Sequence, residues 1–291
     1  MSFLIDKDTR LIVQGITGRE GTFHTEQMLA YGTNVVAGVT PGKGGQEVLG
    51  VPVFDTVKEA KDATDANATV IFVPAKFTPA GVYEALDADI PTILTIAEHV
   101  PVSDMMGCYH MAHMKGARLF GPNSFGIISP GKSKAGFMAH HIFREGSVGV
   151  MSRSATNCYE TVFMMSEAGI GQSTCIGVGG DMIPGSTFVD LLPDFEADEQ
   201  TKAIIIIGEI GGSEEELAAA YIKENVTKPV IVLIAGKNAP KGKSMGHAGA
   251  IVSADGTGSA QVKEKVLREA GCHIAESTSH IVEICQQLGL K

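Results

Sequence analysis

The fold of the amino-terminal half of the chain is indicated by the stretch Leu11-Ile12-Val13-Gln14-Gly15-Ile16-Thr17-Gly18-Arg19-Glu20-Gly21-Thr22. It is an apolar strand that runs into glycines at three-residue intervals. Such a turn lets backbone amides and the start of the next helix face a diphosphate, where the helix dipole favours negative charge. The spacing is G-x-x-G-x-x-G and not the G-x-G-x-x-G of dinucleotide folds. A tight strand-to-helix turn without a ligand is therefore the alternative interpretation.

Short apolar runs continue this pattern over the first 120 residues. Continuous apolar strands of this kind are buried on both faces, as in a parallel doubly wound sheet. We expect strands at 11–13, 35–37, 70–73, 92–96 and 118–120, and helices at 80–87 and 104–114.

A second alternating series follows, with strands expected near 148–151, 174–178, 203–207 and 230–234 and helices near 154–168, 214–225, 259–270 and 279–288. Between the two series, Gly, Pro and Ser residues at 122–131 predict a linker, with the boundary between Ser129 and Gly146. The sequence therefore predicts an α/β fold of two domains in series, 1–130 and 131–291.

Composition excludes several classes of function. The chain has 291 residues, 44% of them apolar, and a net charge of −10, which disfavours non-specific binding to nucleic acid. No apolar run approaches the roughly 20 residues of a membrane span, and no charged leader opens the chain. The five cysteines are widely spaced and form no C-x-x-C pair. We expect reduced thiols, a cytoplasmic location and no metal site.

A lysine follows the second expected strand, where an NAD-binding fold usually places Asp or Glu for the ribose hydroxyls. The loop reads Thr40-Pro41-Gly42-Lys43-Gly44-Gly45. Lys43 suits a phosphorylated ribose, which coenzyme A (CoA) and NADP share. A solvated surface lysine is the alternative.

Three segments of the second half carry candidate chemistry. Ser154 lies between a strand and a helix, where it caps the helix beside amides that an anion can bind. Glu209 ends a very apolar strand and is placed to line a ligand crevice or to orient a histidine. His247 lies between glycines in Gly246-His247-Ala248-Gly249-Ala250, which clear space around its ring. A plain loop histidine is the alternative for His247.

Together these segments resemble the α subunit of succinyl-CoA synthetase along essentially the whole chain. The segments that match that family's motifs, in its order, are Leu4-Ile5-Asp6-Lys7, Gly15 to Gly21, Pro41-Gly42-Lys43-Gly44-Gly45, Gly121-Pro122-Asn123, Ser152-Arg153-Ser154, Gly179-Gly180-Asp181, Pro184-Gly185-Ser186, Gly208-Glu209-Ile210-Gly211-Gly212 and Gly246-His247-Ala248-Gly249-Ala250. The resemblance implies a Rossmann-like CoA-binding domain followed by a flavodoxin-like ligase domain.

The resemblance also implies roles for single residues. His247 would carry a phosphoryl group in each turnover, with Glu209 hydrogen-bonded to the phosphorylated ring, and Tyr159 would lie near the organic acid. The residues that would bind CoA are Thr17, Gly18, Arg19, Glu20, Lys43, Ile96, Ala97 and Glu98. This chain has no G-x-x-x-x-G-K-[ST] loop. The resemblance supplies the missing part, a β subunit with an ATP-grasp site that binds ATP or GTP and Mg²⁺.

Departures from the family pattern cluster around the acid. Ser124-Phe125 stands where the family has Cys-Pro, Ser154-Ala155-Thr156-Asn157-Cys158-Tyr159 replaces Ser-Gly-Thr-Leu-Thr-Tyr, and Ala97-Glu98-His99 replaces Thr-Glu-Gly. Because added donors change specificity more than added methylenes, we expect Ser124, Phe125, Ser154, Ala155 and Tyr159 to shape a site for a small dianionic acid other than succinate. Sulfoacetate and malate are candidates, and succinate is the family default.

The sequence leaves two other functions open. One is a catalytically inactive CoA-binding regulatory module, which the presence of both His247 and Glu209 disfavours. The other is an NADP oxidoreductase, which the glycine spacing disfavours.

Overall fold

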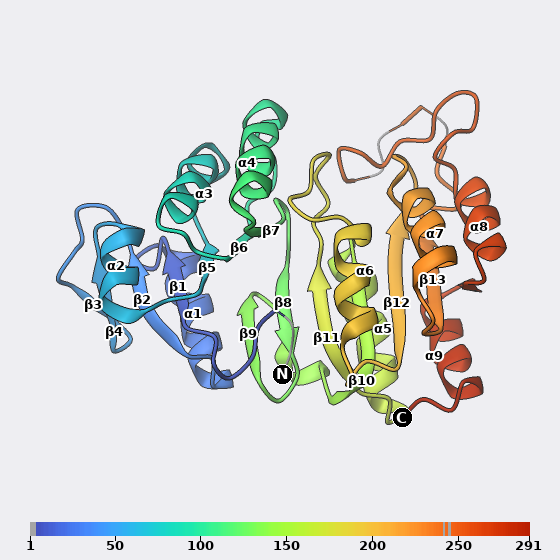
Figure 1. The fold of residues 1–291 in the computed structure, drawn as a ribbon, viewed down its shortest axis with the longest axis horizontal. Helices are drawn as coiled ribbons and strands as arrows, with labels where there is room; N and C mark the ends of the chain where they lie inside the picture. The colour runs from blue at the N-terminus through green and yellow to red at the C-terminus, as the bar shows by residue number, and fades with distance from the viewer. Residues whose placement is uncertain (1–3, 241, 244–245) are drawn as a thin grey trace.

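The computed structural model describes residues 4–240, 242–243 and 246–291. Over these residues the chain forms two seven-stranded sheets, each with helices on both faces (Figure 1). The amino-terminal sheet and the carboxyl-terminal sheet lie side by side, and the strands β8 and β9 form the edge of the second sheet that faces the first (Figure 1). The predicted α/β fold class is confirmed.

The first sheet has the strand order β3-β4-β2-β1-β5-β6-β7. Its strands are β1 (Leu11–Gln14), β2 (Val35–Val39), β3 (Glu47–Val48), β4 (Val51–Phe54), β5 (Ala68–Ile71), β6 (Thr92–Thr95) and β7 (Arg118–Phe120), and its helices are α1 (Arg19–Tyr31), α2 (Val57–Thr64), α3 (Thr78–Asp87) and α4 (Val102–Lys115). All pairs except β3–β4 are parallel. The strand order reverses between β1 and β5, which is where open α/β sheets bind their ligands.

The second sheet has the strand order β14-β13-β12-β10-β11-β8-β9. Its strands are β8 (Gly126–Ser129), β9 (Ser133–Gly136), β10 (Glu145–Ser152), β11 (Gln172–Gly177), β12 (Ala203–Glu209), β13 (Val230–Ala235) and β14 (His273–Ala275), and its helices are α5 (Ala155–Glu167), α6 (Phe188–Ala197), α7 (Glu214–Asn225), α8 (Ala260–Glu269) and α9 (Thr278–Gln287). The parallel strands β10 to β14 follow the flavodoxin order, with the reversal between β10 and β12.

The apolar core explains why these runs became strands. Every residue of β12 from Ala203 to Glu209 is buried, because the helices α6 and α7 cover one face of the sheet and α5 and α9 the other (Figure 1). One core cluster is continuous from β1 through Phe120 and Ile127 to α6, and it joins the two sheets into one packed body. Each remaining sheet face has a cluster of its own.

The predicted linker at 122–131 is wrong in its centre. Gly126–Ser129 forms the fully buried strand β8, which pairs antiparallel with β11 and with β9. The change of sheet therefore lies between Phe120 and Gly126, ahead of residue 130. The division into domains 1–130 and 131–291 stays a prediction about folding units.

Other elements were not predicted. Helix α6 has a capping box between Thr187 and Asp190, but Pro193 inside it interrupts the sequence pattern of a helix. Helix α2 and the strands β3, β4, β9 and β14 were also not predicted, because they are too short to give a clear sequence pattern. All five cysteines are buried and free. Within the described ranges, no helix is long and apolar enough to cross a membrane.

Candidate active site

His247 and Glu209 meet at the carboxyl edge of the second sheet. Glu209 ends β12, and His247 lies in the loop between the neighbouring strand β13 and helix α8. Nδ1 of His247 is 2.7 Å from Oε2 of Glu209. The His247 ring also lies against the backbone of Gly180, because a Cβ atom at that position would be 2.6 Å from three ring atoms. Gly180 follows β11, so segments after three strands position the histidine.

The electrostatic surroundings of His247 favour its protonated form. The hydrogen bond to Glu209 raises the pKa of His247, burial and the nearby Arg153 charge lower it, and the carboxylates of Glu209 and Glu98 raise it further, with a net increase. Because the folded-state pKa is raised, the protonated ring stabilises the fold below the ordinary pKa of histidine, and this contribution is lost as the pH rises through the raised value.

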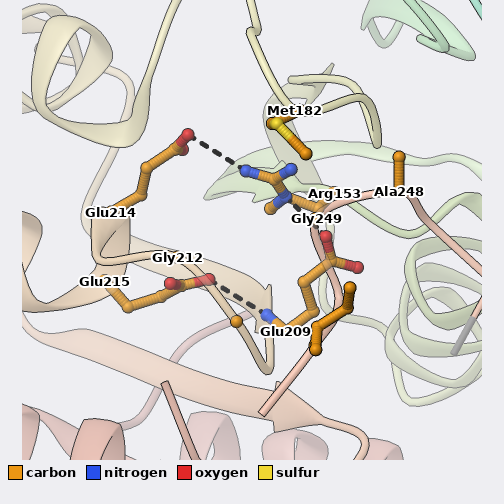
Figure 2. Close-up of a pocket in the computed structure, with 10 residues that line it drawn as sticks. Arg153, Met182, Glu209, Gly212, Glu214, Glu215, Ala248 and Gly249 are labelled. Atoms are coloured by element: carbon orange, nitrogen blue, oxygen red, sulfur yellow. Dashed lines mark hydrogen bonds and ion pairs between the residues drawn. The ribbon is translucent and has the colours of Figure 1, made fainter. Parts of the chain in front are cut away.

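A buried network surrounds Glu209. Nε of Arg153 donates to Oε1 of Glu209 at 2.8 Å, and Nη1 of Arg153 is 3.1 Å from Oε1 of Glu214. The backbone N–H of Glu209 donates to Oε1 of Glu215 at 3.0 Å. Figure 2 shows Arg153 and Glu215 beside Glu209, with Glu214 directed at the Arg153 guanidinium. Arg153 follows β10, and the two glutamates begin α7. Lys263, fully buried, contacts Glu215 from the far side.

Two cavities flank the His247 loop. One of about 320 Å³ is lined by Arg153, Glu209, Glu214 and the loop residues Ala248 and Gly249 (Figure 2). The second, of about 220 Å³, lies between the start of α4 and the loops of the second sheet, and His99, Asp181 and Ala248 line it. Residues of the first and second halves thus meet beside the candidate nucleophile.

The residues predicted to bind CoA all lie at the carboxyl edge of the first sheet. Thr17 and Gly18 precede α1, Arg19 and Glu20 begin it, Lys43 lies in the exposed loop after β2, and Ile96, Ala97 and Glu98 follow β6. Oγ1 of Thr17 is 3.2 Å from Oγ1 of Thr40, which ties the first two loops together. Beside them, at the β1–β5 reversal, is a cavity of about 360 Å³ lined by Gly15, Thr40, Pro74 and neighbouring residues.

The residues predicted around the acid are less uniformly placed. Ser124 and Phe125 are only 1% and 2% exposed. The Ser124 hydroxyl donates to the Gly177 carbonyl at 2.6 Å, and the Phe125 ring packs edge-on against Tyr159. Neither side chain lines one of the cavities beside His247.

Tyr159 and Ala155 belong to α5, and Ser154 directly precedes it. The Tyr159 hydroxyl donates to the Phe137 carbonyl at 3.2 Å, and burial raises its pKa. Ser154 caps the helix by accepting from the Asn157 N–H at 3.3 Å, and Ala155 begins the helix. The structure therefore places Ser154 and Ala155 at a helix start directly after Arg153.

Arg153, Gly180 and His99 were not among the predicted site residues. Arg153 and Gly180 lie within motifs that the sequence displayed, but only the fold shows that they contact the pair of His247 and Glu209. His99 has a φ of 63°, a conformation that favours glycine, and its side chain lines the second cavity. Among the described residues, no group of three or more His, Cys, Asp or Glu side chains is arranged to hold a metal ion.

Comparison with known proteins defines the class. The CoA binding domain family matches residues 6–99, and the CoA-ligase family matches residues 151–273. Among solved structures, ATP citrate lyase of Methanosaeta concilii in complex with (3S)-citryl-CoA has a TM-score of 0.89 at 25% sequence identity. The match covers 98% of this chain and 50% of the lyase chain, so this chain spans about half the length of the lyase. A CoA binding domain followed by a CoA-ligase domain defines the class of acid–CoA ligases.

Curated relatives define the family. The chain is 51% identical over 288 residues to succinate–CoA ligase (ADP-forming) subunit alpha 2 of Archaeoglobus fulgidus, covering 99% of this chain and 100% of that one. It is 51% identical over 285 residues to the corresponding α subunit of Aquifex aeolicus, covering 97% and 93%. The chain belongs to the family of α subunits of ADP-forming succinate–CoA ligases. The predicted resemblance and enzyme class are confirmed, and the residue roles stay predictions.

Replacing Gly180 by alanine tests the contact beneath the histidine. The φ of Gly180 is not in the left-handed region, so its backbone accepts alanine, but the new Cβ displaces the His247 ring. We expect the pKa of His247 to fall towards its ordinary value as the Glu209 hydrogen bond weakens. NMR titration of the His247 ring measures this change.

The matched control is Gly249→Ala, in the same loop as His247. Its Cβ would be in ordinary contact with the Cα atom of Met182, at 3.9 Å. If Gly180→Ala leaves the His247 titration as it is in Gly249→Ala and in the unaltered chain, the packing of the ring on Gly180 has no influence on the pair.

Proposed function

We propose that this chain is the α subunit of an ADP- or GDP-forming acid–CoA ligase that works through a phosphohistidine at His247. The observation that carries this proposal is the 2.7 Å contact between Nδ1 of His247 and Oε2 of Glu209 at the carboxyl edge of the second sheet. A carboxylate that binds Nδ1–H fixes the proton there, so the neutral ring has its lone pair on Nε2. A module that only binds CoA has no use for such a pair.

The proposed chemistry has three transfers. Nε2 of His247 attacks the terminal phosphorus of the nucleoside triphosphate and releases the diphosphate; because Nδ1 keeps its proton, the ring becomes cationic and Glu209 stabilises this charge. An oxygen of the acid then attacks the phosphohistidine, which gives an acyl phosphate and returns the neutral ring. Finally the CoA thiolate attacks the acyl carbon, which gives the thioester and inorganic phosphate.

The proposed cofactor site is the carboxyl edge of the first sheet. A nucleotide fits the β1–β5 reversal, with its phosphates near the start of α1 and Lys43. Glu98, at the end of the proposed CoA site, is close enough to His247 to raise its pKa. This placement supports the proposal that the thiol of bound CoA reaches His247, the phosphoryl carrier, between the two sheets.

The proposed partner is a β subunit with an ATP-grasp site. The relatives named above are α subunits, and the sequence of this chain contains no evident loop for a nucleoside triphosphate. In this proposal the partner holds ATP or GTP together with Mg²⁺, and the active form is a heteromer. Mg²⁺ would neutralise developing phosphate charge on the partner's side of the site.

For the acid we propose a small dianion other than succinate, with sulfoacetate and malate as the candidates. Ser124 and Phe125 support this proposal only indirectly, because they are buried in the core. His99 supports it directly: an imidazole lines the cavity next to Ala248 on a backbone that favours glycine. An added hydrogen-bonding group at that cavity discriminates among acids that differ in polar substituents.

Labelling tests the phosphohistidine. The chain and its β partner, incubated with Mg²⁺ and ATP labelled on the terminal phosphate, are expected to incorporate label that is stable to base and labile to acid. His247→Asn should abolish the label, whereas His113→Asn should retain it, since His113 lies on α4 with its ring against Tyr109. Equal labelling of the two variants would contradict the proposed carrier.

Acid preference tests the role of His99. We expect the reconstituted complex to have a higher kcat/KM for sulfoacetate or malate than for succinate. His99→Gly relieves the backbone strain and should shift the preference towards succinate by roughly tenfold, the value of one lost hydrogen bond to a substrate. His110→Ala on α4 is the control. A wild-type complex that prefers succinate by far would overturn the proposed acid class.

A further inference from the structure

The Arg153 guanidinium contacts three different residues at the candidate site. It is 8% exposed and stands directly after the last residue of β10, at the strand-order reversal beside β12. Nε donates to Oε1 of Glu209, Nη1 contacts Glu214, and Nη2 donates to the Asp181 carbonyl at 3.1 Å. The guanidinium thereby joins the ends of β10 and β12, the loop after β11 and the start of α7.

The two oxygens of Glu209 have different partners. Oε1 accepts from Arg153 at 2.8 Å, and Oε2 lies 2.7 Å from Nδ1 of His247. A carboxylate with one oxygen fixed by a charge-assisted hydrogen bond cannot rotate its other oxygen away without breaking that bond. The orientation of the Glu209 carboxylate towards His247 therefore depends on Arg153.

We propose that Arg153 is a positioning residue for the pair of His247 and Glu209. It fixes Glu209 through Oε1 so that Oε2 faces Nδ1 of His247, and it thereby determines which ring nitrogen of His247 carries the proton. The kinetic part of this inference rests on the proposed function; the part that concerns the ring proton does not.

The main chain of Glu209 is held independently of its carboxylate. Its N–H donates to Oε1 of Glu215, and Glu215 is 2% exposed and paired with the fully buried Lys263. A Cβ on Gly208 would be 2.5 Å from Oε1 of Glu215, so the glycine allows this carboxylate to approach. Because Glu215 and Lys263 retain the backbone, loss of Arg153 frees the carboxylate of Glu209 and leaves the end of β12 in place.

Arg153 stays positively charged although it is buried. Burial opposes the charge, but the carboxylates of Glu214, Glu209 and Glu215 outweigh burial and raise the pKa of the guanidinium. A planar guanidinium reaches three partners in fixed directions, whereas a lysine ammonium is a single point charge on a flexible stem. Lysine at this position would therefore keep the charge and lose the geometry.

The test uses two variants of the full chain, Arg153→Met and Arg153→Lys, and reads the neutral His247 ring by ¹⁵N NMR. We expect the unaltered chain to carry the ring proton on Nδ1. Both variants should show an increased share of the form with the proton on Nε2, because Glu209 no longer faces Nδ1. In the complex with the β partner, phosphoryl uptake by His247 should fall about 10- to 100-fold, the size of the loss when a residue that orients a metal-bound histidine is removed.

Arg118→Met is the matched control. Arg118 also pairs with a carboxylate, Asp194, and donates to a backbone carbonyl, that of Asp190, but it joins β7 to α6 away from His247. Its loss should change thermal stability and leave the His247 ring proton on Nδ1. A general effect of losing an arginine–carboxylate pair would appear in both variants, although the Arg118 side chain is 37% exposed and that of Arg153 only 8%.

Several outcomes would overturn the inference. If Arg153→Met keeps the proton on Nδ1, Glu209 does not need Arg153 for its orientation. If Arg153→Lys keeps the proton on Nδ1 as the unaltered chain does, a positive charge is enough to orient Glu209 and the planar guanidinium is not needed. Should Arg153→Met fail to fold, Arg153→Lys decides by the same measurement. If the unaltered complex takes up no phosphate, the proposed function fails, while the NMR result still decides the role of Arg153.

Discussion

The hydrogen bond between Glu209 and His247 is the interaction on which the rest of the site depends. A histidine that is to carry a phosphoryl group needs a lone pair on one nitrogen and a stabilised cation when that nitrogen has reacted. A carboxylate on the opposite nitrogen meets both needs. It also raises the pKa of the ring, so in the proposed reaction the same contact that prepares His247 limits its reactivity at low pH. Arg153, Gly180 and the buried pair of Glu215 and Lys263 hold this contact in place.

The architecture brings these groups together from distant parts of the chain. In a parallel sheet all carboxyl ends lie at one edge, so residues after β10, β11, β12 and β13 become neighbours although about a hundred residues separate the first from the last. The first sheet supplies its own carboxyl edge, where the proposed CoA site ends at Glu98. The continuous core and the strand β8 fix the two sheets against each other.

The sequence was informative where one physical requirement dominates. Buried parallel strands need continuous apolar runs, and these predicted β1, β2, β5 and β10 to β13 within a few residues. The pattern failed where requirements compete. Glycine and serine in β8 resemble a linker, yet the strand is buried, and Pro193 hides the helix α6.

The site was predictable only in part. Resemblance to a family pointed to His247 and Glu209, and the fold brings them within hydrogen-bond distance. The side chains that hold them could not be inferred, because their contacts exist only after several strand ends have met. Phe125 shows the converse: a change beside the expected acid site lies in the core, where Gly177 leaves room for its ring. The assignment of catalytic and binding roles to individual residues stays a prediction.

The most direct measurement is the pH dependence of phosphoryl uptake by His247 in the reconstituted complex, with and without Glu209→Gln. We predict that the rate in the unaltered complex rises with pH through the raised pKa of His247. Glu209→Gln should lower that pKa, move the rise to lower pH and reduce the plateau by about 10²- to 10⁴-fold, because the ring cation loses its carboxylate. An unchanged profile and plateau in Glu209→Gln would contradict a role of Glu209 in phosphoryl uptake by His247.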